Sequence, residues 1–163
     1  SEMCIRDSRE SDTMIGGNHL GVLVTHADKA SKFLVAGLAK NKTAKNMNKV
    51  TSKLFENIPQ EKTKTFTCDN GKEFSYHEEL SETLSASFYF ANPYHSWERG
   101  LNEHTNGLLR QFFPKGTNFK IVSPEEVEKA VELINNRPRK CLDYRTPFEV
   151  FYELTSDSDA LHC

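Results

Sequence analysis

The sequence lacks a long apolar run, a cluster of cysteines and a large net charge, and each absence excludes a class of protein. In the 163 residues no apolar stretch approaches the roughly 20 residues of a membrane-spanning helix, so we predict no transmembrane helix. The four cysteines and six histidines are scattered without zinc-site spacing, which favours a reduced, cytoplasmic setting. The formal net charge of −2 argues against a simple basic nucleic-acid-binding protein.

The small net charge conceals a local asymmetry. Residues 29–64 carry nine lysines against two glutamates, a balance of +7, whereas residues 65–96 sum to −4. Such a lysine-rich stretch is either a solvated helix face or a surface that contacts phosphate groups, and at this stage both interpretations stay open.

Hydrophobic patterning predicts a single α/β domain. Three strands come first as a meander, and two further strands then alternate with helices before the chain becomes helical. Thr43 and Ser123 are expected helix caps, and Pro59 and Pro114 are expected helix stops. This order matches an RNase H-like α/β fold, a five-stranded mixed sheet flanked by helices with additional C-terminal helices. The predicted strands are 12–15, 20–26, 31–39, 65–68 and 86–90, and the predicted helices are 44–58, 76–85, 97–113, 123–134 and one from 146.

Three carboxylates are expected to converge in such a fold: Asp12, Asp69 and Glu103. Asp69 follows the strand 65–68, and Glu103 lies on the helix 97–113. Converging acids repel one another unless divalent cations neutralise them, so the pattern indicates metal-dependent phosphoryl transfer. Asp-Asn-Gly is also a common turn signal, which leaves a purely structural role open for Asp69.

Cationic and amide side chains surround Glu103 on its predicted helix. Arg99, Glu103 and Arg110 are spaced by four and seven residues and therefore share one face. Asn102 and Asn106 form an adjacent polar stripe. A ladder of exposed salt bridges is the alternative interpretation of the charged face.

Four segments carry a resemblance to a known family. Residues 67–74 read Thr-Cys-Asp-Asn-Gly-Lys-Glu-Phe, and residues 93–117 contain the long motif around Trp-Glu-Arg-Gly-Leu-Asn-Glu. Residues 135–140 and 146–151 supply Asn-Asn-Arg-Pro-Arg-Lys and Thr-Pro-Phe-Glu-Val-Phe. Together they resemble the integrase core of the IS-thirty family of bacterial insertion-sequence transposases, over roughly residues 9–151.

The resemblance implies that Asp12, Asp69 and Glu103 are a DDE triad, because family members place 33 residues between the second and third acids, as this chain does. Asp28 is the rival first acid, but its Ala-Asp-Lys setting predicts a turn. The triad would bind two Mg²⁺ ions, with Mn²⁺ as a substitute, and would serve both DNA cleavage at transposon ends and strand transfer into target DNA.

The expected partners are double-stranded DNA and further copies of the chain in a synaptic complex. Trp97 is a candidate stacking or wedge residue, although a lone Trp at a helix start more often packs into the core. The other candidate DNA contacts are Arg99, Arg110, Lys115, Asn102 and Asn106.

The chain departs from the family pattern before Asp12. Arg9-Glu10-Ser11 stands where Trp-Glu-Gly is usual, which suggests a strand truncated at a foreign junction. We therefore predict a non-native segment at 1–8, a catalytic core at 9–155 and a tail at 156–163, with a DNA-recognition domain missing upstream. Two other functions stay open: an RNase H-like nuclease that cuts without joining, and an inactive remnant that binds DNA or a partner.

Overall fold

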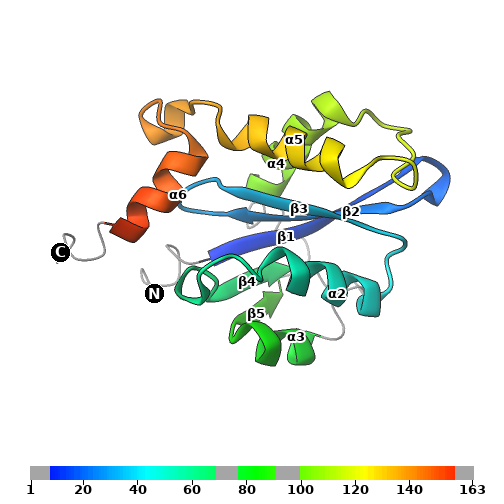
Figure 1. Cartoon of the computed structure of the whole chain (residues 1–163), viewed down its shortest axis with the longest axis horizontal. Coiled ribbons are helices and arrows are strands. Elements are labelled where there is room, and N and C mark those ends of the chain that lie inside the picture. The colour runs from blue at the N-terminus through cyan, green and yellow to red at the C-terminus, as the bar shows by residue number, and fades with distance from the viewer. Residues whose placement is uncertain (1–7, 69–76, 91–99, 157–163) are drawn as a thin grey trace.

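A computed structural model of the chain describes residues 8–68, 77–90 and 100–156 (Figure 1). They form one sheet with helices on both faces, and the predicted order of strands and helices is confirmed. No helix in these segments is long and apolar enough to cross a membrane. The strands are β1 (Ser8–Ile15), β2 (Val22–Asp28), β3 (Leu34–Ala39), β4 (Thr65–Cys68) and β5 (Ser87–Phe90), and the helices are α2 (Ala44–Leu54), α3 (His77–Leu84), α4 (Gly100–Phe112), α5 (Pro124–Asn135) and α6 (Pro147–Ser156).

The sheet is mixed, with strand order β3-β2-β1-β4-β5. β1, β2 and β3 form the antiparallel meander, whereas β4 runs parallel to β1, and β5 runs parallel to β4. Glu10 of β1 lies opposite Thr67 of β4, and Thr67 lies opposite Tyr89 of β5. β1 is therefore the central strand of the sheet, and Asp12 lies on it.

β1 is longer than the sequence predicts. It begins at Ser8, which pairs with Thr65 of β4 and is 6% exposed. Arg9 is fully buried, with its guanidinium 5.0 Å from the ring centre of Phe55 and 5.3 Å from that of Phe151. The predicted start of this strand at Asp12 is therefore wrong, and Ser8 belongs to the sheet; the foreign junction before Asp12 stays a prediction. Residues 1–7 and 157–163 lie outside the described residues, so their assignment stays a prediction.

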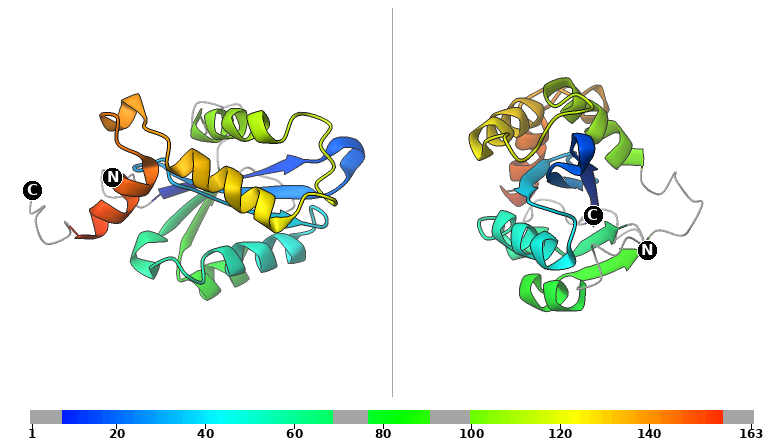
Figure 2. Two further views of the ribbon diagram at one scale, coloured as in Figure 1. Left: turned by 45° about the horizontal axis from the view of Figure 1, so that its top comes forward. Right: turned by 90° about the vertical axis from the view of Figure 1, so that its right-hand side faces the viewer.

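Helices lie on both faces of the sheet (Figure 2), and an apolar layer holds the helices to each face. On one face α4 and α5 pack on β1, β2 and β3, and the layer between them includes Met14, Leu23, Leu34, Leu109 and Ile134. On the other face α2 packs on β2 and β3 with α3 beside it, and this layer includes Val24, Met47, Phe55, Phe66 and Cys68. Because strand side chains alternate between faces, polar residues of β1 are sandwiched between these layers.

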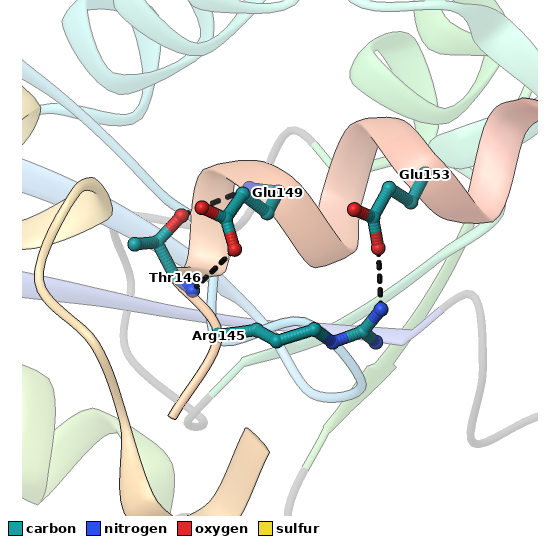
Figure 3. A network of polar contacts seen from close by, with 4 residues as sticks. All are labelled: Arg145, Thr146, Glu149 and Glu153. Atoms are coloured by element: carbon teal, nitrogen blue, oxygen red, sulfur yellow. Dashed lines mark hydrogen bonds and ion pairs between the residues drawn. The ribbon is translucent and has the colours of Figure 1, made fainter. Parts of the chain in front are cut away.

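The helix starts carry the caps that the sequence predicts. Thr43 accepts a hydrogen bond from the Asn46 N–H, and Ser123 forms a reciprocal capping box with Glu126. Thr146 and Glu149 bond reciprocally at the start of α6, and Arg145 pairs with Glu153 one turn further along (Figure 3). These caps fix where α2, α5 and α6 begin.

Candidate active site

Asp12 lies half-buried in the central strand, with its side chain directed at α4. Its Oδ1 accepts a hydrogen bond from the Thr13 N–H at 2.8 Å, and its Oδ2 accepts one from Asn106 Nδ2 at 2.9 Å. Two donors from two different elements therefore fix the orientation of this carboxylate.

The first turn of α4 is attached to β1 by buried polar contacts. The backbone N–H of Asn102 donates to Glu10 Oε2 at 2.9 Å, and Asn102 Nδ2 donates to the Ser11 carbonyl at 3.3 Å. A carboxylate at this position satisfies a helix N–H that lacks an intrahelical partner and complements the helix dipole. Glu10 is 3% exposed and Asn102 is 2% exposed. Asn102 is thus a tether between helix and strand, and its predicted DNA contact is wrong because its side chain does not reach the surface.

Glu103 occupies the next position of α4 and is exposed in its first turn. It precedes Asn106 by three residues, and side chains at that spacing are neighbours on a helix, with Cβ atoms about 5–6 Å apart. Asn106 in turn contacts Asp12. The structure therefore brings the helical acid and the strand acid to the same side of the sheet.

Asp69 lies outside the described residues, as do Arg99 and Trp97. β4 ends at Cys68, the residue directly before Asp69, and β4 is the parallel neighbour of β1. Within the described segments, no group of three His, Cys, Asp or Glu side chains is arranged to hold a metal ion. The predicted convergence of all three acids thus stays a prediction.

Tyr89 is a candidate that the sequence analysis missed. Paired residues of neighbouring strands share a face, so Thr67 and Tyr89 lie on the same face as Glu10 and Asp12. Tyr89 is 55% exposed there, whereas Phe88 points to the other face and stacks on Phe66 with ring centres 4.8 Å apart. The alternation in Phe-Tyr-Phe at 88–90 was the signal that could have singled out this tyrosine.

Three other predicted positions have distinct surroundings. Asp28, the rival first acid, is buried, and its Oδ2 accepts hydrogen bonds from the Ser31 N–H and hydroxyl at 2.8 and 2.6 Å. It closes the predicted turn, so of the two candidate first acids it is Asp12 that faces α4. Arg110 bonds the carbonyls at the end of α4, those of Phe113 and Pro114. Lys115 is exposed in the loop that follows.

His26 lies on the opposite side of the sheet from Asp12. It contacts Ser11 Oγ at 2.7 Å and Thr51 Oγ1 at 3.1 Å and is 1% exposed. Burial, reinforced by the nearby charge of Arg9, lowers the pKa of His26 to about 3, so the imidazole is neutral at pH 7. His26 is therefore a neutral residue of the protein core.

No family model matches the chain, but curated relatives do. The transposase for insertion sequence element IS4351 of Bacteroides fragilis is 42% identical over 149 residues, which are 91% of this chain and 45% of that protein. Transposase InsI for element IS30A of Escherichia coli (strain K12) is 33% identical over 137 residues, 84% of this chain and 36% of that protein. The transposase for element IS1086 of Cupriavidus metallidurans is 35% identical over 151 residues, 91% of this chain and 44% of that protein.

Over most of its length the chain is similar to insertion-sequence transposases, among them one from an IS30 element. It spans less than half the length of these relatives. Two solved structures share the fold described above. The catalytic core of BIV integrase superposes with a TM-score of 0.72 at 18% identity, covering 93% of this chain and 97% of that one. A chain of the simian T-cell lymphotropic virus intasome in complex with PP2A regulatory subunit B56 gamma superposes with a TM-score of 0.73 at 19% identity. The match covers 90% of this chain and 54% of that one. The predicted RNase H-like fold of integrase cores is thereby confirmed.

Proposed function

We propose that this chain is the catalytic core of a DDE transposase that cleaves DNA at transposon ends and transfers the cut strand into target DNA. The observation that carries the proposal is the hydrogen bond from Asn106 to Asp12, because it joins the central-strand acid to the helix that bears Glu103. The curated relatives are named as transposases, which supports the same reaction class.

The strand register supports Asp69 as the third acid. Glu10 lies opposite Thr67, and two further residues along each sequence are Asp12 and Asp69. Thr67 shares a face with Glu10, and alternate residues of a strand return to the same face. If the register continues through Asp69, its carboxylate comes beside that of Asp12.

The donor chemistry of the site fits a hard divalent cation. Asp12 and Glu103 offer carboxylate oxygens, which Mg²⁺ and Mn²⁺ prefer, and Asp12 is already oriented by its two donors. In the proposed site Asp12, Asp69 and Glu103 bind two such ions, which would lower the pKa of an attacking hydroxyl and offset the charge of the departing oxygen. Asn106 holds Asp12 in the orientation that this binding needs.

Double-stranded DNA and further copies of the chain are the proposed partners. Lys115 is exposed after α4, and Tyr89 is exposed on the face that carries Asp12, so both are placed to contact DNA. Arg99, Arg110 and Trp97 complete the proposed set, although Arg110 would have to leave the carbonyls that it now bonds. Phosphate contacts of this kind position DNA without reading its sequence.

A strand-transfer assay with pre-cleaved transposon ends tests the proposal. We expect joined product in the presence of Mg²⁺ or Mn²⁺, and we expect Asp69→Asn to lower its yield at least about a hundredfold, because a metal-binding carboxylate is lost. Asp143→Asn removes an exposed carboxylate from a loop and serves as the matched control, with activity unchanged. Activity retained in Asp69→Asn would reject the assignment of that acid.

The same assay separates the alternative functions. Free cuts without joined product would indicate a nuclease, and neither product would indicate an inactive remnant. Mn²⁺ binding measured by calorimetry gives a readout that does not depend on activity. Asp12→Asn, Asp69→Asn and Glu103→Gln should each weaken that binding, and equal Mn²⁺ affinity in all three variants and the parent would reject the metal site.

A further inference from the structure

The segment that leads into and forms α2 is rich in lysine. Residues 29–55 contain seven lysines and neither an aspartate nor a glutamate. Three of the seven, Lys45, Lys49 and Lys53, lie four residues apart on α2 and are exposed. Among the described residues none of these three forms an ion pair with an acid. A strongly positive stripe therefore runs along this helix.

A groove of about 720 Å³ lies between α2 and α3, and two of these lysines line it. Its α2 wall consists of Lys45, Asn46, Asn48, Lys49 and Ser52. Its α3 wall consists of Glu79, Leu80 and Thr83. We call this feature the lysine groove. The α2 wall is lined by hydrogen-bond donors, and Glu79 is the one acidic side chain among the described residues that line the groove.

The first interpretation of the lysine-rich stretch, a helix face that only contacts solvent, does not explain the charge pattern of α2 well. Exposed helices usually place acids three or four residues from their lysines, and such pairs stabilise a helix by about 0.2–0.5 kcal/mol each. α2 instead places Lys45, Lys49 and Lys53 at successive i, i+4 positions, where like charges destabilise the helix by similar amounts. A bound polyanion would relieve this repulsion and release counterions from its own surface.

We propose that the lysine groove binds the sugar–phosphate backbone of a DNA duplex. This rests on the proposed function, which makes DNA the polyanion that the chain meets. The ribbon shows α2 and α3 on one face of the sheet and α4 on the other (Figure 2). The groove lies between α2 and α3, whereas Asp12 faces α4. DNA held in the groove is therefore a segment outside the carboxylate site, and its binding is independent of base sequence because lysines contact phosphate groups.

The salt dependence of duplex binding tests this proposal. Fluorescence anisotropy with a labelled 30-base-pair duplex of arbitrary sequence would compare the parent chain with Lys45→Gln/Lys49→Gln between 50 and 200 mM NaCl. Two lost phosphate contacts should reduce the slope of log affinity against log salt by about 2. The matched control is Lys120→Gln/Lys129→Gln, which removes two exposed lysines outside the groove and changes the net charge equally. Glu79→Gln should strengthen binding, because it removes the acid from the lining.

Each outcome decides the matter. An unchanged slope in the groove variant, or an equal reduction in the control variant, would overturn the lysine groove as a DNA site. So would a change in self-association, measured by light scattering, without a change in DNA affinity. If the parent transfers strands but the salt slope of the groove variant is unchanged, the groove is rejected as a DNA site and the proposed function is retained. If the groove variant shows a reduced slope but the parent neither cuts nor joins DNA, the proposed function is rejected and the groove is retained as a DNA site.

Discussion

At the scale of single residues, Asn106 determines how Asp12 presents its carboxylate. Asn106→Ala removes the donor to Oδ2 and retains the hydrogen bond from the Thr13 N–H to Oδ1. Loss of a group that orients a metal ligand typically costs about 10–100-fold in metal affinity or activity. We therefore expect strand transfer to fall within that range and the Mn²⁺ concentration at half-maximal activity to rise.

The Mn²⁺ titration separates positioning from DNA contact. Gln111→Ala truncates an exposed amide on the same helix. It should leave both the strand-transfer activity and the Mn²⁺ concentration at half-maximal activity unchanged. A variant Asn106→Ala with lower activity but an unchanged Mn²⁺ requirement would show that Asn106 acts on DNA rather than through Asp12.

At the scale of elements, Asn135 joins α5 to the edge strand β3. Its Oδ1 accepts from the Leu34 N–H and its Nδ2 donates to the Leu34 carbonyl, both at 2.9 Å, and Leu34 is fully buried. Asn135→Ala leaves both backbone groups without these partners, at about 1–3 kcal/mol for each unsatisfied group. Urea unfolding should show a free energy of unfolding lowered by about 2 kcal/mol or more. The neighbouring Asn136→Ala removes an exposed bond to Glu132 and should change it by less than about 1 kcal/mol; equal losses would refute the tether.

The same scale shows why element boundaries were harder to predict than the elements. Alternating Val, Leu and Phe marked β2 and β3, and caps marked the helices, but Arg9, Glu10 and Ser11 have no hydrophobic pattern. They are nonetheless buried in β1, because Phe55 and Phe151 flank Arg9 and the Asn102 N–H bonds Glu10. Buried polar strands are invisible to periodicity, since their partners come from distant segments.

At the scale of the whole molecule, topology explains both the success and the limit of the sequence analysis. Asp12 and Glu103 were expected together, and the pairing of β1 with α4 brings them to one side of the sheet. The spacing of residues in the sequence predicted neither the role of Asn102 as a tether nor the exposure of Tyr89. The burial of a side chain depends on which face of its helix or strand a neighbouring layer covers. The acid Asp69 stays a prediction that rests on strand register.

The stability of the whole molecule should depend on pH through His26. Its folded pKa of about 3 lies below the value near 6.5 of an unfolded chain, so the unfolded state binds the proton more readily between these values. Stability is then fully present above pH 6.5 and falls as the pH drops toward 3, by up to about 1.4 kcal/mol per pH unit. Between pH 7 and pH 5 the parent should lose about 2 kcal/mol more than His26→Gln in urea unfolding, because the variant lacks this proton site. His104→Gln, at an exposed histidine of α4, controls for the loss of a histidine; an equal pH dependence in His26→Gln and the parent would mean that the buried imidazole does not couple folding to protons.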